Sequence, residues 1–233
     1  MRILLGVCLF FIAMVGQSAG DSQSNREKNP LSSSVVHNSG DMQIELEALS
    51  DTAEDIYDLA KVGKWNRIMK KFDELKKTEQ AIKLIRNGEN DFYAQRLRNK
   101  IEELEQAISA KNKKNTMRFA NNITFLEVAM IGDLKPRVPT NVMLLDYCGR
   151  ELEILSEEKD IDKLFNLVIR MHLIWQNLIP QLIDKNGTKE IKNFSEIMMR
   201  LERAKTPDEY NHLAIQVADE VDNLEKLFKK KPK

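Results

Sequence analysis

Glu209 and His212 have a spacing that is typical of a metal site. They stand three positions apart, as Glu-x-x-His, and would face the same side of a helix. Di-iron helical bundles use such a pair on each of two helices, with further glutamates from two others. The region around residues 112–115 has no histidine, and Ile169 stands where a glutamate would have to precede His172. A metal site built from His172, Glu209 and His212 is therefore only the alternative prediction.

His172 also stands beside Met171 and three residues before Trp175, which suggests a haem or copper site. Methionine and histidine are common axial ligands of haem iron. The sequence has no Cys-x-x-Cys-His attachment motif, however, and adjacent residues of a helix point in different directions. Met171 instead continues an apolar stripe. We therefore interpret these residues as core, expect no cofactor, and keep a metal- or haem-handling bundle as the alternative function.

A second candidate site combines two arginines with two aromatic residues on neighbouring predicted helices, namely Tyr147, Arg150, Arg170 and Trp175. Asp146 can pair with Arg150 one helical turn away. Gly149 in mid-helix costs about 1 kcal/mol relative to alanine, so we expect another element to pack closely there. One interpretation is a small pocket with arginine anion contacts and aromatic walls. The other is a close helix crossing with a surface ion pair, which the pattern favours.

Composition argues against several classes of function. The 36 Lys and Arg residues balance the 36 Asp and Glu residues, so no basic footprint indicates nucleic-acid binding. No pair of carboxylates stands out as an acid–base pair, and none of the nine glycines lies in a phosphate-binding loop. Cys148 stands among apolar residues at helical spacing and is expected to be buried. We therefore predict a protein that is not an enzyme.

The first residues indicate an exported protein. Arg2 precedes an apolar run over residues 3–15, and small residues follow up to Gly20. This pattern is typical of a secretory signal peptide, and the run is shorter than the roughly twenty residues of a membrane span. An uncleaved anchor is the alternative. The prediction is a periplasmic or secreted protein with no membrane span after cleavage.

From Met42 onward, apolar residues recur at spacings of three and four, which is the period of a helix. Pro180 should kink its helix or end it early. Thr206, Pro207 and Glu209 predict a capping box at the start of the last helix. The eight predicted helices cover residues 42–62, 64–86, 91–112, 115–132, 140–157, 160–184, 189–205 and 207–229.

The second half of the chain repeats the apolar pattern of the first about 96 residues on. Leu49 corresponds to Leu145, for example, whereas Glu54 corresponds to Arg150, so packing repeats and polar chemistry does not. A fixed period is the signature of a duplicated unit. We predict an all-α fold of two tandem four-helix units; a single eight-helix array and an α-solenoid of hairpins are the alternatives. The predicted signal peptide, disordered leader, repeat 1, hinge, repeat 2 and basic tail cover residues 1–20, 21–41, 42–134, 135–139, 140–229 and 230–233.

The stretches 138–155 and 221–225 resemble exported helical-bundle proteins of Gram-negative bacteria that lack an assigned role. The resemblance covers mainly residues 138–228. It implies a periplasmic location and no particular activity. Together these features predict a non-enzymatic helical scaffold that binds a protein or a small-molecule partner.

Overall fold

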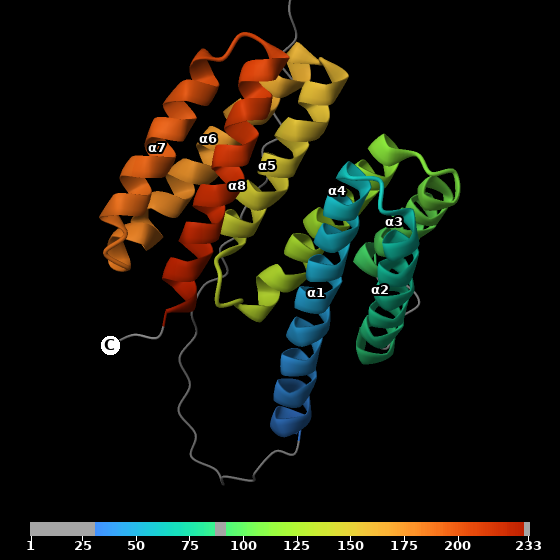
Figure 1. Ribbon diagram of the computed structural model, residues 1–233. Helices are drawn as coiled ribbons and strands as arrows, with labels where there is room; N and C mark the ends of the chain where they lie inside the picture. Colours follow the sequence, from blue (N-terminus) through green and yellow to red (C-terminus); the bar gives the residue numbers. More distant parts are fainter. Residues whose placement is uncertain (1–30, 87–91, 231–233) are drawn as a thin grey trace, which may run out of the picture.

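The protein is all-α, as predicted. The computed structural model describes residues 31–86 and 92–230, and no strand occurs among them. Most turns between the helices are short, so that neighbours in sequence pack together (Figure 1). The elements are α1 (Leu31–Lys61), α2 (Trp65–Arg86), α3 (Phe92–Ser109), α4 (Lys113–Ile131), η1, a 3₁₀ turn (Gly132–Leu134), α5 (Thr140–Glu158), α6 (Ile161–Asp184), α7 (Thr188–Arg203) and α8 (Pro207–Lys229).

Two apolar cores form in the described part of the chain. The first lies among α1, α2, α3 and α4, and includes Leu46 and Ile123. The second lies among α5, α6, α7 and α8, and includes Trp175 and Phe194. Figure 1 shows the two groups of helices beside each other, and α4 of the first group contacts α5 of the second. Ile154 of α5 is the exception, because it packs into the first core. Folding of each group on its own remains a prediction.

The helix ends agree with the capping rules at several positions. The Thr206 side chain accepts from the Glu209 backbone N–H, and the Glu209 carboxylate accepts from the Thr206 N–H at 3.0 Å, which confirms the predicted capping box. The expectation that Pro180 ends its helix early is wrong, because α6 continues to Asp184. Proline removes a single backbone hydrogen bond there, and Pro180 lies near the helix end.

The start of α1 differs from the prediction. The helix begins at Leu31, so part of the predicted disordered leader, residues 31–41, is helical. Pro30 in the sequence directly precedes this start, and proline is well tolerated at helix beginnings. Met42 is the first residue of the first core among those whose side chains the structure describes. Residues 1–20, the predicted signal peptide, and residues 21–30 lie outside the described residues.

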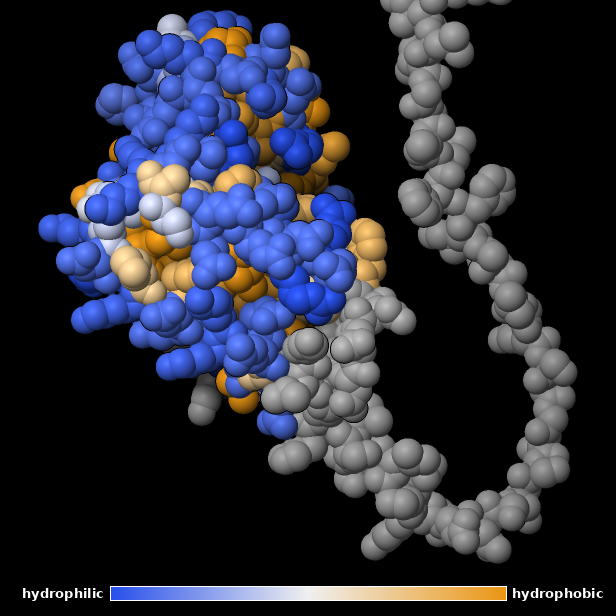
Figure 2. All heavy atoms as spheres, turned by 90° about the vertical axis from the view of Figure 1, so that its right-hand side faces the viewer, coloured by the Kyte–Doolittle hydropathy of each residue, from blue (hydrophilic) through white to orange (hydrophobic). Residues whose placement is uncertain are grey.

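Among the described residues, none of the helices is both long enough and apolar enough to cross a membrane. The side of the molecule shown in Figure 2 is mostly covered by hydrophilic residues, with hydrophobic residues visible between them. This surface is typical of helices whose apolar stripes face inward.

Candidate functional site

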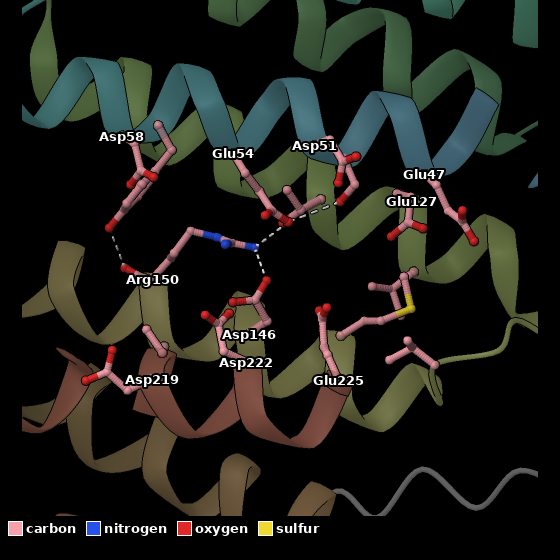
Figure 3. Close-up of a pocket in the computed structure, with 18 of the residues that line it drawn as sticks. Glu47, Asp51, Glu54, Asp58, Glu127, Asp146, Arg150, Asp219, Asp222 and Glu225 are labelled. Carbon is pink, nitrogen blue, oxygen red and sulfur yellow. Dashed lines mark hydrogen bonds and ion pairs between the residues drawn. The ribbon is translucent and has the colours of Figure 1, made fainter. Parts of the chain in front are cut away.

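A cleft lies between the two cores and has a volume of about 660 Å³. Its walls come from α1 and α4 on one side and from α5 and α8 on the other (Figure 3), and residues 136–138 also line it. Cavities of roughly 300–1,000 Å³ are typical of small-molecule sites. This central cleft is therefore the candidate site.

The lining of the central cleft is strongly acidic. Ten carboxyl groups line it together with four basic side chains, so acidic residues outnumber basic ones by six. The four basic residues are Lys61, Arg137, Arg150 and Lys229. The ten acidic residues are Glu47, Asp51, Glu54, Asp58, Glu127, Asp146, Glu153, Asp219, Asp222 and Glu225.

Arg150 lies at the centre of the cleft and joins three helices. Its guanidinium Nη2 is 3.0 Å from Glu54 Oε1 on α1 and 2.5 Å from Asp146 Oδ2 on α5, and its Nε donates to Asn121 Oδ1 on α4 at 3.1 Å. The Asp146–Arg150 pair confirms the predicted contact along one helix face. It is not a surface pair, since the Arg150 side chain is only 15% exposed. The positive charge of Arg150 is therefore neutralised within the protein.

A second set of contacts joins α1 to α5 beside Arg150. The Tyr57 hydroxyl donates to Glu153 Oε2 at 2.8 Å, and Lys61 Nζ lies 2.8 Å from Glu153 Oε1. Tyr57 and Glu153 are 96 residues apart, as are Glu54 and Arg150. Corresponding positions of the predicted repeat thus meet across the cleft. Each pair combines two different residue types, so its members form a hydrogen bond or an ion pair. Identical residues at the two positions would repel each other or leave a gap.

Glu127 on α4 is the most unusual residue of the cleft. Its side chain lines the cleft but is 0% exposed, and neither carboxylate oxygen has a hydrogen-bond partner. Burial, reinforced by the charges of Glu54 and Glu47, raises the pKa of Glu127 to about 9. Glu127 is therefore a neutral carboxylic acid at pH 7, and its polar atoms lack the partners that buried groups normally have.

The carboxyl groups around Arg150 also hold protons more tightly than usual. Burial raises the pKa of Glu54 to about 7, although Arg150 acts in the opposite direction. Burial likewise raises the pKa of Asp146 and of Asp51. The single positive charge of Arg150 is thus too small to offset the effect of burial on the pKa of these carboxyl groups.

Several cleft carboxylates have no partner within the described chain. Arg150 pairs with Glu54 and Asp146, Lys61 with Glu153, and Lys229 with Glu225 at 2.5 Å. The Arg137 guanidinium donates to the Lys229 backbone carbonyl. No hydrogen bond or ion pair to a described residue is formed by the side chains of Asp51, Asp58, Glu127 and Asp219.

The structure does not assemble the four predicted ligand-binding residues into one pocket. Only Arg150 lines the central cleft. Trp175 is 2% exposed in the second core, stacks on Phe194 with 4.5 Å between ring centroids, and donates to Ser195 Oγ at 3.3 Å. Tyr147 packs against Phe125 at 5.1 Å, and Arg170 is exposed on α6. Trp175 lies away from the cleft because a large apolar indole is buried in the core of its own helical unit.

Two smaller predictions for α5 are confirmed. A Cβ added to Gly149 would lie 3.0 Å from Val217 Cγ1, so α8 packs closely on the glycine. Cys148 is buried, and burial raises the pKa of its thiol to about 12. Both residues therefore serve the packing of α5.

The residues of the alternative metal prediction have other contacts. Glu209 belongs to the capping box, and His212 Nδ1 lies 3.1 Å from the Asp208 carbonyl oxygen. His172 Nδ1 is 2.7 Å from Glu202 Oε1, beside an apolar hollow of about 320 Å³ between α6 and the α7–α8 end. No group of three or more His, Cys, Asp or Glu side chains in residues 40–82, 92–132 and 134–230 is arranged to hold a metal ion.

Sequence reasoning missed Glu127, although a signal was present. Ala120, Ile123, Thr124 and Glu127 stand at positions i, i+3, i+4 and i+7, which places the glutamate on the buried stripe of its helix. Leu224 stands 97 residues later, at the corresponding position of the second half. A carboxylate at a core position is rare unless it is paired.

Comparison of the chain with known protein families, with curated proteins and with solved structures gives no match. The function therefore has to be inferred from the chemistry of the central cleft.

Proposed function

We propose that this protein is a non-enzymatic binding module and that the central cleft binds a small organic cation. The observation that carries the proposal is Glu127, a fully buried carboxyl group that lines the cleft with both oxygens unpartnered. An unpartnered buried polar group costs about 1–3 kcal/mol. A ligand that donates a hydrogen bond or a positive charge to Glu127 would remove this cost.

The charge balance favours a cation over the anion that the arginines suggested from sequence. The cleft has six more carboxylates than basic groups, and Arg150 is already bound by Glu54 and Asp146. An anion would meet net repulsion in this field. A cation would be attracted, and it would stabilise the ionised form of the carboxyl groups whose pKa is raised.

The apolar part of the lining favours an organic cation. The side chains of Val128, Ile131, Val138, Met143 and Ile215 also face the cleft. Sites for organic ligands typically combine such apolar walls with a few fixed polar groups. A hydrated metal ion would gain little from these walls, whereas an ammonium with a hydrocarbon body would contact both kinds of surface.

Binding without covalent chemistry is consistent with the groups present. Cys148, the free thiol of the described residues, is buried in the second core and is held in its protonated form. As part of the same proposal, the module acts outside the cytoplasm, in the periplasm or as a secreted protein, as the signal-peptide pattern of residues 1–20 predicts.

A thermal-shift panel tests the proposed function. The purified chain is heated with matched compounds of similar size, namely alkylamines, alkylcarboxylates and neutral alcohols, at low ionic strength. We expect the unfolding midpoint to rise with amines alone, and the rise to be lost in Glu127→Gln. The matched control is Glu102→Gln, an exposed glutamate on α3. Stabilisation by carboxylates, or no stabilisation by any amine, would refute the proposal.

A further inference from the structure

The acidic residues of the cleft are arranged in two rows. On α1, Glu47, Asp51, Glu54 and Asp58 recur at spacings of four and three, so they share one face of the helix. Eleven residues at a rise of 1.5 Å make this row roughly 16 Å long. On α8, Asp219, Asp222 and Glu225 form the facing row. Figure 3 shows Asp58 and Asp219 at one end and Glu47 and Glu225 at the other.

We propose that the ligand of the central cleft is a linear polyamine, bound in extended form between the α1 and α8 rows with one ammonium group at Glu127. This inference rests on the proposed function and specifies its ligand class. A compact cation with a single charge would meet only one part of the rows. An extended cation with several charges could reach more than one of the four cleft carboxylates that have no partner among the described residues.

The unpaired carboxylates are distributed as such a ligand requires. Asp58 and Asp219 are free at one end, Asp51 is free further along α1, and Glu127 lies deepest. Lys229 pairs with Glu225 and marks the other end. Successive carboxylates on α1 are about one helical turn apart, roughly 5–6 Å. Three or four methylene groups between ammonium nitrogens span a similar length.

Glu127 favours the binding of an ammonium group over the binding of a hydrated ion. Its carboxyl oxygens have exposures close to zero, so the side chain must turn toward the cleft to meet a ligand, and the ligand must shed its water and donate hydrogen bonds. An ammonium group has up to three N–H donors. The apolar side chains of Ile131 and Met143 line the same cleft and can contact the methylene groups between the charges.

A calorimetric series of amines tests the inference. Butylamine, 1,4-diaminobutane, spermidine and spermine are titrated into the purified chain at low ionic strength, with Mg²⁺ and a short lysine peptide as comparison cations. We expect binding at one site, with each added ammonium group up to spermidine tightening it by at least about tenfold. Butylamine that binds as tightly as spermidine would overturn the polyamine inference and leave the proposed organic-cation function standing.

Other outcomes separate the inference from its alternatives. Mg²⁺ that binds as tightly as spermidine would show a non-specific acidic surface, and binding of the peptide alone would show a protein partner; either result overturns the inference. If no amine binds, the inference and the proposed function both fall.

Two variants locate the ligand in the cleft. The double variant Asp219→Asn, Asp222→Asn changes exposed side chains, so it is expected to fold normally. It should weaken spermidine by about tenfold or more and butylamine by less than about twofold, because a monoamine needs only the Glu127 region. Glu127→Gln should weaken both, and Glu102→Gln neither. Equal weakening of spermidine and butylamine by the double variant would contradict extended binding between the rows.

Discussion

Replacing Glu127 by glutamine is expected to stabilise the protein. The change keeps the size of the side chain and removes its ability to ionise. In the folded protein the pKa of Glu127 is about 9, against 4.5 for an ordinary glutamate, because the group is buried among other carboxylates. Between these two values the folded protein holds a proton that the unfolded chain releases. The free energy of unfolding of the wild type therefore falls as pH rises through this window.

The size of the effect follows from the same shift. Each pH unit inside the window is equivalent to about 1.4 kcal/mol. At pH 7, which is 2.5 units above 4.5, the wild type should be less stable than Glu127→Gln by about 3 kcal/mol, and at pH 5 by less than about 1 kcal/mol. For a chain of this size, about 3 kcal/mol corresponds to a rise of roughly 6–12 °C in Tm. The glutamine amide in the variant and the neutral acid of Glu127 in the wild type are both buried without a partner. Their burial costs are similar and cancel when the two proteins are compared.

Urea unfolding at a series of pH values between 5 and 8.5 measures the effect, with Glu102→Gln as the exposed control. We expect the stability difference between wild type and Glu127→Gln to grow with pH, and the control to follow the wild type at every pH. A difference that is constant with pH, or a variant less stable than the wild type at pH 7, would refute the argument that Glu127 is buried without a partner.

Three further predictions concern the Arg150 contacts, the two groups of helices and the segment before the first core. Arg150→Met leaves Glu54 and Asp146 facing each other without their cation, so it should destabilise the protein by about 3 kcal/mol at pH 7. The loss should be smaller at pH 5, where Glu54, with a pKa of about 7, takes up a proton; urea unfolding would show it, and a pH-independent loss would contradict it. Residues 41–134 and 138–233, expressed separately, should each give a helical protein that melts cooperatively by circular dichroism, because each contains one core; two aggregating halves would contradict this. Deletion of residues 21–40, which precede Met42, the first core residue that the structure describes, should change Tm by less than about 2 °C, and a larger loss would mean that this segment docks on the fold.

The helices could be predicted from the sequence because their signals are local. The apolar spacing, the capping box at Thr206 and the close approach at Gly149 each involve neighbouring residues or the lack of a side chain. The early start of α1 was missed because residues 31–41 have no apolar periodicity, although Pro30 permits a helix after it.

The central cleft could not be predicted because its contacts are not local. The Glu54–Arg150 and Tyr57–Glu153 contacts depend on how α1 faces α5, and no spacing within either helix reports this. Trp175 and Arg150 lie on consecutive helices, which suggests a shared pocket, but the apolar stripe of α6 places Trp175 in the second core. Glu127 could be identified from the sequence, because a single carboxylate on the buried face of a helix is unusual and points to a special environment.

The protonation state of Glu127 with and without an amine tests the central claim most directly. Carbon-13 NMR of the protein labelled at glutamate side-chain carboxyls reports it, with the Glu127 resonance identified by its absence in Glu127→Gln. At pH 7 we predict the shift of a neutral carboxylic acid in the free protein, consistent with its pKa of about 9, and the shift of an ionised carboxylate when the cleft is saturated with spermidine. A Glu127 that is already ionised in the free protein, or whose resonance does not move at saturation, would contradict the account.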